Sequence, residues 1–176
     1  MVKQGTVITD AATKDTGEFL ETNESSGGKF LKIKWLFNPG GVKPAPHVHL
    51  LQDETFEVIS GYYTCEYKGE IKRIGPGEKM TFDKAVGHMH YNADDVPCEV
   101  IQTFTPALDA EDLLYRLVEV SNEGKIVNGE PPLLEVMVWM RKYKAKTYLA
   151  KIPVPVQNSL SYVLAPIGRM LGHGGK

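Results

Sequence analysis

Apolar and polar residues alternate along much of the first two-thirds of the chain. Residues 30–37 read FLKIKWLF, in which large apolar side chains recur at every second position from Leu31, with lysines between them in the first half. This period of two predicts a strand with one buried face. Further short strands are expected at 55–60, 62–67, 71–74, 79–82, 88–91 and 99–105, separated by turn residues. Many short strands with regular turns are typical of a sandwich or barrel and not of a βαβ sheet.

The pattern changes to helical spacing after Pro106. Asp109 is in position to cap a helix over 110–122. We expect a second helix over about 133–149 and a third over about 156–171. The predicted fold is therefore an all-β barrel followed by two to three C-terminal α-helices, with residues 1–106 as the barrel domain and 107–176 as a helical extension.

The third predicted helix has one apolar face. Its members recur at three- and four-residue steps: Leu160, Val163, Leu164, Ile167 and Leu171. We expect this face to pack on the barrel or on a second subunit. A helix lying on a membrane surface is the alternative, which the few cationic residues near this face do not favour.

Charge is divided unevenly along a chain whose formal net charge is only −2. Residues 1–124 hold 12 basic and 20 acidic side chains, whereas residues 125–176 hold 8 and 2. The basic extension is expected to dock on its own acidic domain. No basic recognition helix is evident, so a nucleic-acid partner is not predicted.

The N-terminal sequence lacks the apolar core of a secretory signal, and no apolar run is long enough to span a bilayer. Cys65 and Cys98 both fall in strand-like segments, and two cysteines do not make a disulfide framework. Reduced thiols in a cytoplasmic protein are therefore expected, and membrane association is not.

Candidate chemistry begins at two histidines in a His-x-His pair. His47 and His49 are two residues apart, so on a strand their imidazoles project from the same face. Glu54 follows after four residues, which allows the chain to turn and present a carboxylate from the adjoining strand. His88 and His90 form a second pair of the same kind. Clustered imidazoles with a carboxylate are typical ligands of a divalent transition metal.

At these residues the sequence resembles the cupin superfamily. Gly41, His47, His49, Glu54 and Gly61 match every fixed position of the first cupin motif, G-x5-HxH-x4-E-x6-G. The resemblance covers about residues 30–105 and does not extend to the helical tail.

The second cupin motif, G-x5-P-x-G-x2-H-x3-N, is matched at Gly77, His88 and Asn92 with the family's spacing. The chain departs from it at Asp83, where the family has Pro, and at Ala85, where it has Gly. Fifteen residues separate the motifs, as in compact members of the family.

The resemblance implies a double-stranded β-helix, also called a jelly-roll barrel, holding one metal ion. It also implies a homodimer, because cupins commonly pair through barrel strands, and the apolar face of the third predicted helix adds slight support. The implied ligands are His47, His49, Glu54 and His88. His90 faces the same way as His88 and is the alternative, either as a substitute ligand or as a hydrogen-bond partner of one. Asn92 is expected to support the site. Iron, manganese, nickel, copper and zinc all suit this ligand set, and calcium and magnesium do not.

Two classes of function follow from this resemblance. One is an oxygenase acting on a small organic substrate, with Glu54 able to serve as a catalytic base; a metal-dependent isomerase or decarboxylase is a close relative. The other is a non-enzymatic barrel that binds or senses a small ligand and relays its presence through the helical tail. The fold by itself does not decide between them.

Overall fold

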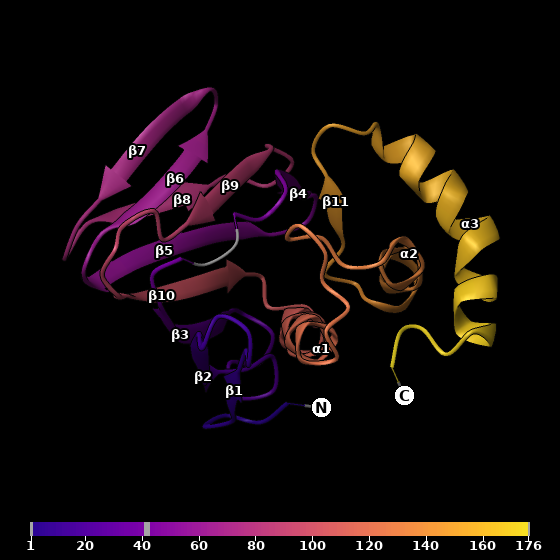
Figure 1. Cartoon of the computed structure of the whole chain (residues 1–176), viewed down its shortest axis with the longest axis horizontal. Coiled ribbons are helices and arrows are strands. Elements are labelled where there is room, and N and C mark those ends of the chain that lie inside the picture. Colours follow the sequence, from indigo (N-terminus) through magenta and orange to yellow (C-terminus); the bar gives the residue numbers. More distant parts are fainter. Residues whose placement is uncertain (1, 41–42, 176) are drawn as a thin grey trace.

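The computed structural model describes residues 2–40 and 43–175, and its strands form two antiparallel sheets (Figure 1). The first sheet has the order β1-β2-β3-β10-β5-β8, with bounds Val7–Thr9, Thr16–Glu21, Leu31–Phe37, Cys98–Thr105, Asp53–Ser60 and Lys79–Phe82. The second has the order β11-β4-β9-β6-β7, with bounds Thr147–Leu149, His47–His49, His88–Tyr91, Tyr63–Tyr67 and Glu70–Ile74. The predicted double-stranded β-helix with C-terminal helices is confirmed.

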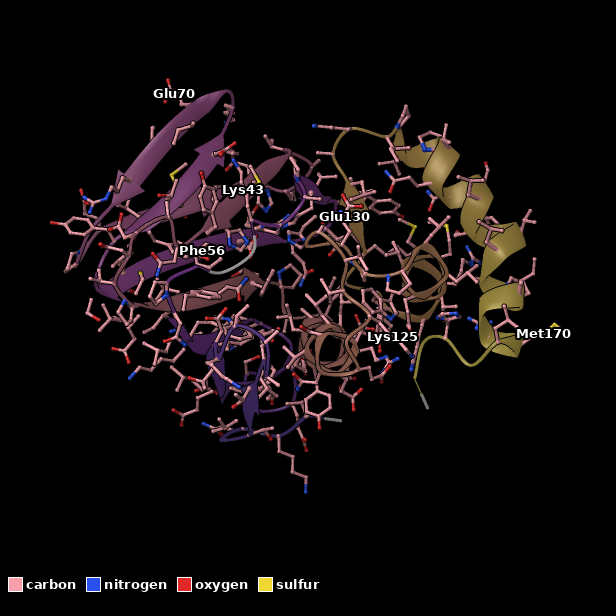
Figure 2. The ribbon with its side chains drawn as sticks, viewed as in Figure 1. Lys43, Phe56, Glu70, Lys125, Glu130 and Met170 are labelled. Atoms are coloured by element: carbon pink, nitrogen blue, oxygen red, sulfur yellow. The ribbon has the colours of Figure 1, made fainter. Side chains whose placement is uncertain are left out.

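The barrel core consists of the inward residues of these alternating strands. On β3, Leu31, Ile33 and Trp35 are buried while the lysines between them are not, as the period of two predicts. Phe56 on β5 points into the space between the sheets (Figure 2). Strands β1 and β2 are additions that the sequence pattern did not reveal, because β1 has only three residues and half of β2 is Thr or Glu.

Three helices follow the barrel strands. They are α1 (Ala110–Asn122), α2 (Leu133–Lys142) and α3 (Val154–Met170). The first matches its prediction, and the third begins two residues early and ends at Met170. The helices lie to one side of the sheets, with α3 at the end farthest from β7 (Figure 1). Within the described ranges, no helix combines the length and apolar character needed to cross a bilayer.

The prediction of one helix over 133–149 is wrong. Helix α2 ends at Lys142, and Thr147–Leu149 instead forms β11, which pairs antiparallel with β4. Thr and Tyr favour extended backbone, and the free edge of β4 offers ladder hydrogen bonds that a continued helix would leave unmade. Tyr148 is buried in a cluster with Met137 and Met140 of α2, which fixes the strand in place.

Asp109 occupies the N-cap position of α1 as predicted, but its side chain does not cap the helix. Its carboxylate accepts hydrogen bonds from the backbone N–H groups of Lys144 at 2.8 Å and Ala145 at 2.6 Å, and makes no side-chain cap bond to its own helix. Asp109 therefore ties the start of α1 to the loop between α2 and β11.

A buried ion pair joins the helices to the C-terminal tail. Glu135 on α2 is fully buried, and its carboxylate accepts hydrogen bonds from Arg116 on α1 and from the backbone N–H of Gly174, each at 2.7 Å. Two donors offset part of the desolvation cost of this carboxylate. Glu135 thus connects α1, α2 and the tail at one point.

Candidate metal centre

Strands β4 and β9 bring three histidines together. His47 and His49 project from the same short strand, with ring centroids 5.2 Å apart. His47 is directly opposite His88 in the β4–β9 pairing, and these ring centroids are 4.6 Å apart. The pairing register therefore places residues about 40 positions apart in the sequence at one point of the second sheet.

The carboxylate comes from the other sheet. Glu54 on β5 is 1% exposed, and its Oε2 lies 2.8 Å from Nε2 of His88 and 3.4 Å from Nε2 of His49. One ligand atom from each of His47, His49, Glu54 and His88 can be chosen so that all four lie within 4.8 Å of one another. The group thus sits between the two sheets and could hold a metal ion.

The Nδ1 atoms of His47 and His88 each lie next to a backbone carbonyl. Nδ1 of His47 lies 3.1 Å from the carbonyl of Ala45, and Nδ1 of His88 lies 3.0 Å from the carbonyl of Val86. A carbonyl only accepts, so each Nδ1 must carry the proton. In the neutral ring Nε2 then carries a lone pair that can bind a metal. Metal-bound histidines usually have this tautomer.

This tautomer creates a conflict that a cation resolves. A neutral His88 presents the Nε2 lone pair to a carboxylate oxygen of Glu54 only 2.8 Å away, and two acceptors at that distance repel. Either a second proton on His88 or a metal ion between the atoms relieves the repulsion. In addition, Nε2 of His49 is buried and has no hydrogen-bond partner within the described part of the chain. Both observations fit a cation at this position.

The charge states of the donors also suit a metal. Burial, together with the neighbouring histidines, lowers the pKa of His47 well below its ordinary value, so its imidazole is neutral. Burial raises the pKa of Glu54, but His90, His49 and His88 outweigh this effect and hold it well below the ordinary value. Neutral imidazoles and an ionised carboxylate are the forms that bind metals, and this donor set fits a transition metal.

Gln102 on β10 is a site residue that sequence reasoning missed. Its Nε2 donates to Oε1 of Glu54 at 2.5 Å, and its Oε1 accepts from Nε1 of Trp35 at 2.6 Å. The signal was available: alternation in 99–105 places Gln102 between Val100 and Phe104 on the inward face, where an amide needs partners. The hydrogen bonds from Trp35 to Gln102 and from Gln102 to Glu54 fix the orientation of the Glu54 carboxylate.

Thr147 is a second missed residue. Its Oγ1 lies 3.2 Å from Nδ1 of His49, and it comes from β11 of the helical extension. No sequence signal could have found it, because residues 133–149 were predicted as one helix. The extension therefore supplies a group that contacts one of the four clustered side chains.

His90 lies beside the cluster but is not one of its four members. Its Nε2 is 3.6 Å from Oε1 of Glu54, and its Nδ1 is 2.9 Å from the hydroxyl of Tyr63. Burial lowers the pKa of His90 to about 4, so the ring is neutral near pH 7. Asn92 lies farther along and donates to the carbonyls of Phe37 and Val96, so it holds the following loop.

The turn before His88 forms despite its two departures from the motif. Ala85 adopts a left-handed φ of 63°, the conformation that a glycine would adopt without strain, and its N–H donates to the carbonyl of His49. Asp83 accepts a hydrogen bond from the Tyr67 hydroxyl at 2.7 Å. Gly41, the first position of the other motif, lies outside the described residues.

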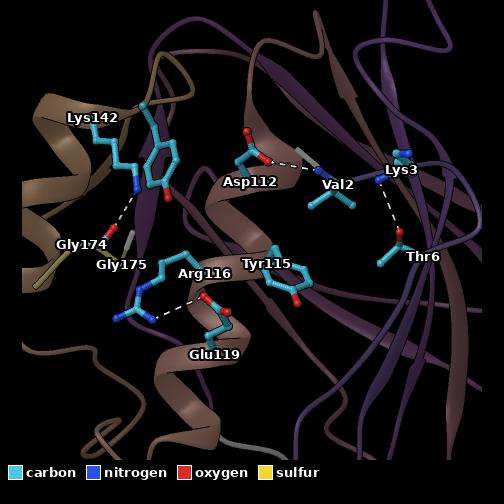
Figure 3. Close-up of a pocket in the computed structure, with 11 residues that line it drawn as sticks. Val2, Lys3, Thr6, Asp112, Tyr115, Arg116, Glu119, Lys142, Gly174 and Gly175 are labelled. Atoms are coloured by element: carbon cyan, nitrogen blue, oxygen red, sulfur yellow. Dashed lines mark hydrogen bonds and ion pairs between the residues drawn. The ribbon is translucent and has the colours of Figure 1, made fainter.

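A small cavity is lined by His90, the histidine beside the cluster. Its volume is about 190 Å³, and rings of Phe37, Tyr63 and Tyr91 contribute to its lining together with His90 and Asn92. A larger cavity of about 650 Å³ lies elsewhere, between α1, the N-terminal segment and the C-terminal tail (Figure 3). None of the four clustered residues lines either cavity, but the smaller one is lined by His90, whose Nε2 is 3.6 Å from Glu54, so it is the candidate substrate pocket.

Comparison with known proteins identifies the barrel. The family model described as Cupin domain matches residues 33–104. A comparison with curated proteins found no match. One similar solved structure is KdgF from Halomonas sp., at 22% identity and a TM-score of 0.51, covering 59% of this chain and 91% of that one. Another is a predicted oxalate decarboxylase from Thermotoga maritima, at 17% identity and a TM-score of 0.50, covering 60% and 99%. At identities this low the likeness shows a shared fold and says nothing about whether the reaction is shared.

Proposed function

This chain belongs to the cupin superfamily, and from that premise we propose that it is a metal-dependent enzyme that oxygenates a small organic molecule. The observation that carries the proposal is the convergence of three imidazoles and one carboxylate between the two sheets. If bound, a metal held by these four residues would supply the Lewis-acid or redox chemistry that oxygenation of a substrate needs.

His47, His49, Glu54 and His88 are the proposed ligands, and iron, manganese, nickel, copper or zinc the proposed metals. Glu54 has a second proposed role as the catalytic base. Its charged carboxylate is held at Oε1 by Gln102, while Oε2 faces His88 and His49. A carboxylate fixed in this way can accept a substrate proton without first reorienting.

The substrate is proposed to occupy the cavity beside His90. Its volume of about 190 Å³ is below the roughly 300–1,000 Å³ of sites for drug-sized ligands, so the pocket suits a molecule of few atoms. The aromatic rings that line it would exclude water from the reaction, and the Tyr63 hydroxyl and His90 would orient polar groups of the substrate.

An oxygen-independent isomerase or decarboxylase is the second candidate. The observation that favours it is the hydrogen bond between the Tyr63 hydroxyl and His90 at the wall of the cavity. Such a pair can supply or take up a proton. An isomerase moves a proton next to a carbonyl group, and a decarboxylase protonates the carbon from which carbon dioxide has left.

The first experiment measures metal content. We would purify the protein without chelators and determine bound metals by elemental mass spectrometry, beside a His47→Ala/His49→Ala variant. His173→Ala is the matched control, because His173 lies next to Glu135 in the helical extension. Near-stoichiometric transition metal is expected in the natural protein and the control, and none in the double variant. If the natural protein and the double variant are equally free of metal even after reconstitution, the proposed metal site is refuted.

The second experiment separates the candidate reactions. Oxygen consumption by the metal-loaded protein is measured with a panel of small enols, thiols and catechols. Uptake that depends on His47 and His49 supports the oxygenase. A metal-loaded protein that consumes no oxygen with any of them, yet releases carbon dioxide or isomerises a small keto acid, supports the second candidate. Binding of such molecules without turnover would instead indicate a sensing barrel.

A further inference from the structure

Helix α3 has its polar and apolar faces inverted relative to an ordinary surface helix. The side chains it buries are small or polar: Gln157, Ser161, Ala165 and Gly168. The side chains it exposes are mostly large and apolar, including Leu160, Tyr162, Val163, Ile167, Met170 and Leu171. Val163 is 65% exposed and Met170 86%, and Met170 projects away from the rest of the molecule (Figure 2). We call these six exposed residues the outer face of α3.

The inward side of α3 makes close contacts with α2 and hydrogen bonds with the segment before the helix. Gly168 approaches α2 so closely that an added Cβ would lie 2.8 Å from a methyl of Val138 and 3.1 Å from the carbonyl of Leu134. Gln157 donates to the carbonyls of Leu149 and Ile152. Rotating the helix to bury the outer face would break these contacts, so the apolar residues stay outside. Of the five residues expected to pack on the barrel or on a second subunit, Leu164 packs against the cluster of Val48, Met137, Met140 and Tyr148. The other four, Leu160, Val163, Ile167 and Leu171, are exposed in this chain. A contiguous exposed apolar face of this kind marks a docking surface.

The surroundings of this face are basic. No acidic residue follows Glu135 in the sequence, whereas seven basic residues do: Arg141, Lys142, Lys144, Lys146, Lys151, Arg169 and Lys176. Arg169 is exposed on α3, and Lys151 is exposed just before the helix begins. The guanidinium of Arg141 lies over the ring of Tyr162 at 3.8 Å, which places a cation at the edge of the outer face.

We propose that the outer face of α3 binds an anionic lipid surface, with the helix lying in the plane of the headgroups. The helix of 17 residues would contact the membrane over about 25 Å. Large apolar side chains would enter the acyl boundary while the basic residues meet lipid phosphates and carboxylates. A second copy of this chain is a poorer fit, because a twofold interface would bring the same basic residues against one another.

The test is co-sedimentation of the full chain with vesicles. Binding is expected to vesicles of 70% phosphatidylcholine and 30% phosphatidylserine, and little or none to pure phosphatidylcholine. Binding should weaken from 50 to 300 mM NaCl, since salt screens the attraction to the headgroups. Replacing both Lys151 and Arg169 by Gln should weaken it roughly fivefold per cation.

A Val163→Glu/Ile167→Glu variant tests the outer face directly. Both side chains are exposed, so the melting temperature should hold while vesicle binding is lost. Ile71→Glu is the matched control, because Ile71 is 70% exposed on β7 and far from α3 (Figure 1). The control should bind vesicles like the natural protein.

A fluorescent reporter gives a result that does not depend on loss of binding. In a Tyr162→Trp variant the new indole lies on the outer face, whereas the natural Trp35 and Trp139 are buried. Anionic vesicles should shift its emission to the blue, and brominated lipids should quench it. The proposal is overturned if anionic vesicles neither bind nor shift the emission. It is equally overturned if the natural protein is a dimer that Val163→Glu/Ile167→Glu converts to a monomer without changing vesicle binding.

Discussion

The hydroxyl of Thr147 provides a direct test of whether the helical extension tunes the candidate metal site. Thr147→Val removes the oxygen that lies 3.2 Å from Nδ1 of His49 and keeps the size and β-branching of the side chain. The backbone pairing of Thr147 with His49 does not involve that oxygen and should persist. The change therefore alters one contact behind one proposed ligand.

The expected effect on metal affinity is larger than the effect on folding. Loss of a partner that orients a metal-binding histidine typically costs 10- to 100-fold in affinity, or about 1.4–2.7 kcal/mol. A single intramolecular hydrogen bond contributes only about 0.5–1.5 kcal/mol to the free energy of unfolding. Since Thr147 is only partly buried, the smaller end of that range is expected for the metal-free protein.

The assay is a competition titration of Zn²⁺ between the protein and a fluorescent chelator, with urea unfolding of the metal-free protein alongside. Thr103→Val is the matched control, because Thr103 lies on β10 between the inward residues Gln102 and Phe104 and so faces outward. Zn²⁺ affinity within twofold of the natural protein in Thr147→Val would refute the reasoning. So would an equal loss of affinity in the control.

Three other substitutions or measurements follow from the same structure. Gln102→Leu leaves the buried carboxylate of Glu54 without its donor, so the metal-free protein should lose about 2–3 kcal/mol of unfolding free energy in urea; a loss below about 0.5 kcal/mol would contradict this role. Ala85→Gly relieves a left-handed backbone conformation that costs a non-glycine residue about 1–2 kcal/mol. Glycine also raises the entropy of the unfolded chain, which destabilises the folded protein by about 0.4–1 kcal/mol. The melting temperature should therefore rise slightly and not fall. Burial raises the pKa of Cys65 to about 12 and that of Cys98 to about 11, so both should react with Ellman's reagent at pH 8 only after unfolding. The unfolded thiols ionise near pH 9 while the folded ones keep their protons, so stability should fall as the pH rises above 9, by up to about 1.4 kcal/mol per pH unit for each thiol, and a flat profile would argue against it.

The link between the extension and the barrel changes how the chain is best divided. Strand β11 lies beyond residue 106, yet it continues the sheet that holds the three histidines. Asp109 and Glu135 then tie the helices to that strand and to the tail. A truncation at residue 106 would therefore expose the edge of β4 and remove Thr147, and we expect such a fragment to bind metal more weakly than the full chain.

The sequence by itself determined most of the barrel strands and the grouping of two His-x-His pairs with Glu54. Alternation at a period of two is a local property, so it predicted β3 and β10 together with their inward residues. The two His-x-His pairs are local as well, since residues two apart on a strand share a face. The choice between His88 and His90 stayed open in the sequence, because both face the same way; the register that sets His47 opposite His88 is what places His88 nearest to Glu54.

Only the tertiary structure decided what depends on distant partners. In residues 144–149 only Thr147 and Tyr148 favour extended backbone, which is too short a signal to predict a strand, and β11 forms because the edge of β4 is free to pair with it. Asp109 could satisfy its own helix or the loop at Lys144, and packing selected the loop. The orientation of α3 was equally undetermined: the sequence shows an apolar face, but the close approach of Gly168 to α2 turns that face outward. Local spacing fixes which side chains share a face, whereas contacts made far along the chain decide where that face points.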